Sequence, residues 1–197
     1  MKKLMVAVMM LAMASVAIAG PLAQTAAPVE VGQIDGAAFV TLGIGDYTDD
    51  LAISARATYG AIENLLVQLG LGYGTDSECI GLTLAGQYAL VLDLPVELAV
   101  RVALDIGDLE NATDSMSVTP GVVVSKSIEA VAGLALYLGL GYAIPVGQEG
   151  DPDSNLTFAF GATYDIAAVE NLTAIAEIGM VKNSDTLVAS IGASYAF

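Results

Sequence analysis

Large apolar residues occupy alternate positions along most of this chain, and this alternation limits how the chain can fold. From position 96 to position 106 every even-numbered residue is Val, Leu or Ile. The odd positions hold Glu97, Arg101, Asp105 and two alanines. The same alternation recurs near residues 156–166. Successive side chains of a β-strand point to opposite faces, so a period of two predicts strands and not helices.

The alternating segments divide most of the chain into about ten strands, each long enough to cross a bilayer when tilted. We expect these strands near 36–45, 50–61, 64–75, 78–91, 94–106, 115–127, 131–144, 154–167, 171–182 and 185–197. Short connections with one acidic residue alternate with longer acidic connections, which predicts a series of hairpins. Eight or twelve strands are the alternatives, because the first strand has the weakest pattern and termini on one side require only an even number.

One uncharged stretch needs separate treatment. Residues 130–148 contain no charged residue and are long enough for a membrane-spanning helix. Their large residues share one parity and their glycines share the other, and only Tyr137 interrupts this order. A period of two with several glycines therefore favours a strand here as well.

The start of the chain has the pattern of a secretory signal peptide. Within residues 1–19, two lysines precede an apolar run at 4–13, and residues 17–19 match an A-x-A cleavage site. A transmembrane anchor is the alternative, although the apolar run is short for a span. We therefore expect cleavage after this segment, a periplasmic lead-in at 20–35 and a barrel domain at 36–197.

Alternation fits a soluble barrel or sandwich as well as a membrane barrel, so the face opposite the bulky residues decides between them. That face holds Gly, Ala, Ser and Thr with few charges, which suits a narrow lumen better than a surface in water. A closed barrel also satisfies every backbone hydrogen bond inside a bilayer, which an open sheet cannot do. We therefore expect an all-β protein, a closed antiparallel up-and-down transmembrane β-barrel, with its acidic residues at the two rims.

Tyrosines support this orientation, because those on the bulky parity lie near strand ends. Membrane barrels carry aromatic girdles at both lipid–water interfaces. The expected girdle residues are Tyr59, Tyr73, Tyr88, Tyr142, Tyr164 and Tyr195. Ordinary core tyrosines of a soluble sheet are the alternative.

The last strand resembles the C-terminal signature of bacterial outer-membrane β-barrel proteins. It is amphipathic and ends in Phe197, with Tyr195 two residues earlier and Ile191 on the same face. The resemblance covers about 36–197 and points to the superfamily of small outer-membrane barrels. It implies a place in the bacterial outer membrane, with outer-membrane lipid and the barrel-assembly machinery as partners, the latter reading this C-terminal strand. It also implies that both termini and the short turns face the periplasm.

Composition excludes several other classes of function. The chain has no His, one Cys and only six basic residues. Without histidine, the usual general base and zinc ligand are missing, so we expect no enzyme, no catalytic residue, no cofactor and no tight metal site. Six basic residues also argue against binding of nucleic acid. Residues 151–155 open like a calcium loop but lack its later Gly and Glu, so we expect at most weak divalent-cation association with the acidic loops.

Charged residues on the small-residue parity are expected to line the lumen. They are Arg56, Glu97, Arg101, Asp105 and Glu177. Arg56, Arg101 and Glu177 lie at similar distances from their short turns, which predicts a similar depth. We expect the two arginines to pair with Glu97 and Glu177 and to obstruct the lumen, because an unpaired charge in a confined site is costly. Separate charges solvated by water are the alternative.

These observations together predict an integral outer-membrane barrel with a narrow, charge-obstructed lumen, acidic extracellular loops and a structural or surface role. A small passive channel is one alternative, and its acidic mouths predict a preference for cations. Binding or adhesion through the loops is the other alternative.

Overall fold

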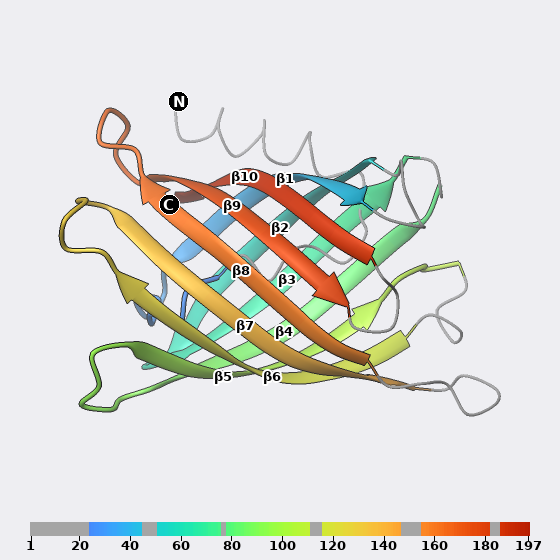
Figure 1. Ribbon diagram of the computed structural model, residues 1–197, viewed down its shortest axis with the longest axis horizontal. Helices are drawn as coiled ribbons and strands as arrows, with labels where there is room; N and C mark the ends of the chain where they lie inside the picture. The colour runs from blue at the N-terminus through green and yellow to red at the C-terminus, as the bar shows by residue number, and fades with distance from the viewer. Residues whose placement is uncertain (1–23, 45–50, 76–77, 111–115, 147–154, 182–185) are drawn as a thin grey trace.

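The strands of the computed structural model follow one another, antiparallel, around a closed barrel (Figure 1). They are β1 (Ile34–Ile44), β2 (Leu51–Ile62), β3 (Leu65–Gly74), β4 (Ile80–Leu90), β5 (Glu97–Ile106), β6 (Met116–Ser127), β7 (Leu134–Pro145), β8 (Asn155–Asp165), β9 (Leu172–Val181) and β10 (Thr186–Ala196). The structure describes residues 24–44, 51–75, 78–110, 116–146, 155–181 and 186–197. The signal peptide expected at residues 1–19 lies outside these ranges.

The number of strands and their positions confirm the prediction from alternation. Every strand begins and ends within three residues of its expected bounds. Within the uncharged stretch at 130–148, residues Leu134–Pro145 form strand β7 and not a helix. The largest differences come from longer turns before β5 and β7, and Gly133 adopts a positive φ of 80° in the second of these turns.

The first and last strands close the barrel. Their paired residues run from Asp35 opposite Ala196 to Ile44 opposite Leu187. The amide nitrogen of Phe197 then donates a hydrogen bond of 2.9 Å to the carbonyl oxygen of Ile34. Closure pairs the two edges that an open sheet would leave without hydrogen-bond partners.

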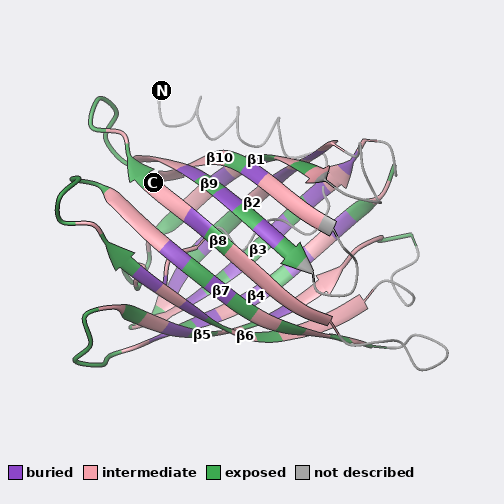
Figure 2. Ribbon diagram, viewed as in Figure 1, coloured by how far each residue is buried: buried purple, intermediate pink, exposed green. Residues whose placement is uncertain are grey.

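Large apolar side chains cover the outside of the barrel, and small ones line the inside. Exposed and buried residues alternate along the strands in Figure 2. Leu69 is 49% exposed and Ile191 is 67% exposed, whereas Ala99 and Ala103 are completely buried. The bulky parity therefore faces outward, as the sequence predicts, and this is the arrangement of a wall surrounded by lipid.

The short turns lie at one end of the barrel, together with Phe197 (Figure 1). Two of them contain an asparagine with positive φ, Asn64 at 64° and Asn171 at 65°. Asparagine tolerates this left-handed conformation better than most residues, which explains why the same Glu-Asn-Leu sequence recurs at both turns. Within the described ranges, no helix is long and apolar enough to cross a membrane.

Candidate functional site

Side chains from strands far apart in the barrel meet in the middle of the lumen. Arg56 on β2, Arg101 on β5, Tyr137 on β7 and Glu177 on β9 all point inward, and we call these four residues the constriction. Arg56 interacts electrostatically with Glu177 and Tyr137 and is repelled by Arg101, which in turn interacts with Glu177. The guanidinium of Arg56 also lies 5.3 Å from the centre of the Phe39 ring. Opposite charges are thus placed face to face across a narrow interior.

Tyr137 forms the firmest contact of the constriction. Its hydroxyl donates a hydrogen bond of 2.8 Å to Oε2 of Glu177, and both side chains are buried. Its ring lies over Gly161 on the neighbouring strand, where a Cβ atom would overlap the ring. Phe39 lies over Gly192 in the same way. Glycine opposite an inward aromatic residue therefore provides the space that a ring needs in a narrow lumen.

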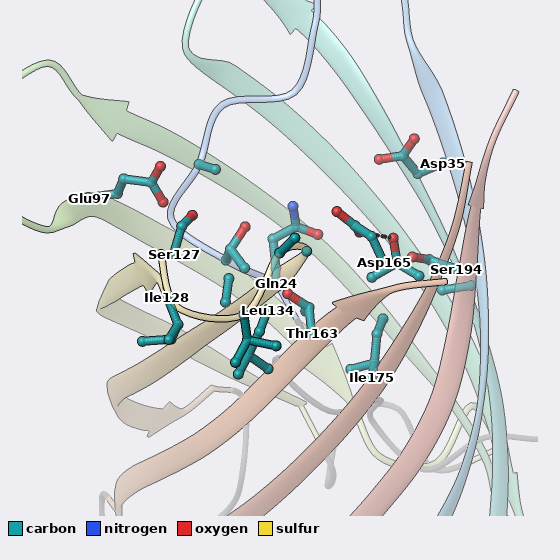
Figure 3. Close-up of a pocket in the computed structure, with 18 of the residues that line it drawn as sticks. Gln24, Asp35, Glu97, Ser127, Ile128, Leu134, Thr163, Asp165, Ile175 and Ser194 are labelled. Atoms are coloured by element: carbon teal, nitrogen blue, oxygen red, sulfur yellow. Dashed lines mark hydrogen bonds between the residues drawn. The ribbon is translucent and has the colours of Figure 1, made fainter. Parts of the chain in front are cut away.

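Two cavities lie on opposite sides of the constriction. The larger one, at the short-turn end, has a volume of about 510 Å³ and is lined by Arg56 and by the carboxylates of Asp35, Glu97 and Asp165. Figure 3 shows Gln24 projecting into this short-turn cavity between Glu97 and Asp165. The side chains of the constriction stand between this space and the other end of the barrel.

The smaller cavity is nearer the long-loop end and has a volume of about 230 Å³. Its charged lining consists of Arg101, Asp105 and Glu177. A third and much smaller space, of about 10 Å³, is bordered by both Arg56 and Arg101 and has room for about one water molecule. Each arginine therefore borders this small space in addition to one of the two larger cavities.

The predicted lumen charges divide into a central group and two outer residues. Arg56, Arg101 and Glu177 come together, whereas Glu97 and Asp105 lie towards opposite ends of β5. Oε2 of Glu97 accepts a hydrogen bond of 2.6 Å from Ser125, and not from an arginine, in the described part of the chain.

Asp105 is also held by hydroxyl groups. Its Oδ1 accepts a hydrogen bond of 2.8 Å from Thr83, and its Oδ2 accepts one of 3.3 Å from Thr119. The acidic residues on β5 are therefore fixed by neighbouring strands, and Asp105 attracts Arg101 even more strongly than Glu177 does.

The N-terminal segment, residues 24–33, enters the lumen at the short-turn end. The sequence predicts only a lead-in here and gives it no contact with the barrel. Ala26 is completely buried, and its amide nitrogen donates a hydrogen bond of 2.9 Å to Oγ of Ser125. Nε2 of Gln87 donates one of 2.8 Å to the carbonyl oxygen of Thr25. Polar side chains of β4 and β6 thus hold the backbone of this segment.

The same segment reaches the constriction at two residues, Gln24 and Ala26, and Ala26 packs in one buried cluster with Tyr137. Oε1 of Gln24 accepts hydrogen bonds from Nε2 of Gln68 at 3.2 Å and from Nη2 of Arg56 at 3.4 Å. Near its other end, Gly32 and Gln33 exchange backbone hydrogen bonds with Gly60 on β2. These contacts hold the segment against the wall at both ends.

The sequence offers little sign of this segment, because residues 24–33 have no period and their polar residues are common in linkers. Tyr137 is different, since it is the one large residue that breaks the parity of its strand. A large side chain on the small-residue face is a usable signal for a residue that projects into a lumen.

The predicted girdle and C-terminal residues lie on the barrel as follows. Tyr59, Tyr88, Tyr142 and Tyr164 are exposed on the outer wall, and Tyr73 and Tyr195 are partly exposed. The rings of Tyr195 and Phe197 pack edge to face with their centres 5.1 Å apart, and Ile191 is exposed on the same strand. Their roles at the membrane interface and in assembly stay predictions.

Metal ligands do not cluster in the part of the chain that the structure describes. No group of three or more His, Cys, Asp or Glu residues there could hold a metal ion. Most of the calcium-like sequence at 151–155 lies outside the described residues. Weak association of divalent cations with the acidic loops therefore stays a prediction.

Comparisons with known proteins give a fold and no sequence family. No family model matches the chain, and no curated protein is significantly similar to it. Among solved structures, the NanC porin is 10% identical, with 81% of this chain and 98% of that chain covered and a TM-score of 0.55.

Two further solved barrels have lower TM-scores. The KdgM porin in complex with disordered oligogalacturonate is 12% identical, with 84% and 99% of the two chains covered and a TM-score of 0.47. The N-terminal β-barrel domain of Pseudomonas aeruginosa OprF is 12% identical, with 85% and 98% covered and a TM-score of 0.40. The closed wall, the outward-facing apolar residues and the fold shared with NanC show that this chain has the architecture of a transmembrane β-barrel.

Proposed function

We propose that this protein is an integral membrane barrel whose lumen is closed at rest by the constriction, and that it has a structural or surface role in the membrane. The observation that carries this proposal is the interaction of four inward side chains from different strands, with Arg56 bordering one cavity and Arg101 and Glu177 bordering the other. Glu177 balances part of the charge of the arginines, and Tyr137 holds Glu177 in place. A hydrated ion that crosses from one cavity to the other would have to pass these side chains.

Recordings of the refolded barrel in planar bilayers test this proposal. We expect the wild-type barrel to pass no steady current and Arg101→Ala to show openings, because the substitution removes one side chain of the constriction. Val102→Ala is the matched control, since Val102 is the next residue on β5 and is 55% exposed to the outside. A steady open conductance in the wild type would contradict the closed lumen.

A passive channel is the second candidate, and the carboxylates in both cavities favour it. Asp35, Glu97 and Asp165 line one cavity, and Asp105 and Glu177 line the other. Acidic linings attract cations and repel anions. If the wild type conducts, its reversal potential in a salt gradient should have the sign of cation preference, and anion preference would contradict this candidate.

A further inference from the structure

The N-terminal segment fills part of the lumen without belonging to the wall. Ala26 is completely buried, and side chains of Ser125 and Gln87 bind the backbone around it. The wall does not depend on these contacts, because the seam between β1 and β10 begins at Asp35, after the segment. The segment can therefore leave the lumen while all pairings between the barrel strands stay intact.

The side chains that hold the segment are not fully satisfied while it is in place. Gln68 and Gln87 each donate an amide hydrogen to it, yet their own Oε1 atoms are buried and have no partner in the described structure. A buried acceptor without a partner is costly, and water can supply the missing bond once the segment leaves. The free energy that holds the segment in the lumen is therefore modest, which allows the segment to be displaced.

Gln24 connects this segment to the constriction. Its Oε1 is an acceptor for Arg56, so departure of the segment removes a hydrogen bond that keeps this guanidinium in the lumen. Asp35 attracts Arg56 electrostatically, and both residues line the short-turn cavity. Departure of the segment removes this bond together with the packing of Ala26 in the buried cluster that contains Tyr137, so two of the four constriction side chains lose a neighbour at the same time.

We propose that the N-terminal segment is a gate: while it occupies the lumen it contacts both Arg56 and Tyr137 of the constriction, and when it withdraws towards the short-turn end these contacts are lost and the two cavities join. This rests on the closed resting state proposed above. The joined path is lined by the carboxylates of Asp35, Glu97, Asp105, Asp165 and Glu177 and by Arg56 and Arg101; the carboxylates outnumber the arginines, so the path favours cations. In this proposal, the N-terminal segment of the chain itself opens and closes the lumen.

Planar-bilayer recordings of Ala26→Trp test the gate in the full chain. An indole has no room at this completely buried position, so the substitution should expel the segment while leaving every strand unchanged. We expect the open probability to rise at least about tenfold over the wild type. Val31→Trp is the matched control, because Val31 lies in the same segment and is 63% exposed; it should stay as silent as the wild type.

Thiol labelling tests the same movement without a bulky side chain. In a Cys79→Ser background, Ala26→Cys and Val31→Cys are exposed to a membrane-impermeant maleimide. We expect labelling at position 26 to be at least about tenfold slower than at position 31, since one side chain is buried and the other exposed. Adding Gln24→Ala should accelerate labelling at position 26 and leave position 31 unchanged.

Two results would overturn the gate. One is a folded Ala26→Trp barrel that stays silent, and the other is equal labelling of positions 26 and 31 in the absence of further substitutions. Steady conductance of the wild type contradicts the closed resting state itself. A silent wild type with a silent Ala26→Trp contradicts the gate alone, so the two proposals fail separately.

Discussion

Tyr137 and Glu177 form a buried hydrogen bond across strand β8, with 2.8 Å between the hydroxyl oxygen and Oε2. The strand between them supplies Gly161, which gives the ring the space to lie flat against the wall. Three successive strands therefore cooperate to aim one carboxylate at the two arginines. This arrangement is the part of the lumen that substitutions should affect most clearly.

Removing the hydroxyl should destabilise the barrel. Tyr137→Phe leaves Glu177 with one hydrogen bond fewer in a buried site, so we expect a loss of about 1.5–3 kcal/mol in the free energy of unfolding. The change is measured by unfolding the barrel with urea in lipid vesicles, with the folded fraction read from its mobility on a gel. Tyr142→Phe is the control, because Tyr142 is 47% exposed on the outer wall, and it should change the free energy by less than about 0.5 kcal/mol.

Adding a methyl group under the Tyr137 ring should also be costly. A Cβ at position 161 overlaps the ring, so Gly161→Ala should lower the free energy of unfolding by about 1–3 kcal/mol. Gly86→Ala is matched to it, since a Cβ there meets nothing within 4 Å. Equal stability of the two variants in the same urea assay would show that the ring does not need the glycine.

A third substitution acts on the N-terminal segment from the wall. A Cβ at Gly60 would overlap the carbonyl oxygen of Glu30, so Gly60→Ala should loosen the segment from β2. We expect limited proteolysis to cut the chain near residues 24–33 at least about tenfold faster than in the wild type, while the strands stay protected. Gly70→Ala, where the nearest atom lies 3.4 Å away, should not change the rate.

We expect a charged substitution on the outer wall to cost more free energy in the middle of the bilayer than at its surface. Leu69 lies near the middle of β3 and is 49% exposed, so Leu69→Arg should cost about 2–4 kcal/mol in folding into lipid vesicles. Val91 lies in a short turn and is 81% exposed, so Val91→Arg should cost only about 0–1 kcal/mol. If both substitutions cost the same, the wall at Leu69 does not face lipid hydrocarbon.

The sequence predicts features that depend on neighbouring residues better than contacts between residues far apart in the chain. The strands and their two faces follow from alternation, which each segment carries by itself, as at Leu69 and Gln68. The bond from Glu97 to Ser125 could not be foreseen, because it depends on the register between β5 and β6.

The N-terminal segment shows the same limit more strongly. Its bonds to Ser125 and Gln87 join positions far apart in the chain, and no repeating pattern marks either partner. Small polar residues such as Thr25 and Gln24 suit a linker in water as well as a lumen. Only the diameter of the closed barrel, which depends on all strands together, creates a space that this segment fits.

The bond between Phe197 and Ile34 has a consequence for the order of events during assembly. Ile34 follows the N-terminal segment directly, so the residues that enter the lumen are made before β10, the strand that completes the wall around them. Until β10 pairs with β1, the sheet is open and does not enclose residues 24–33. Enclosure of the segment and completion of the wall are therefore one late step, timed by the arrival of the C-terminal strand.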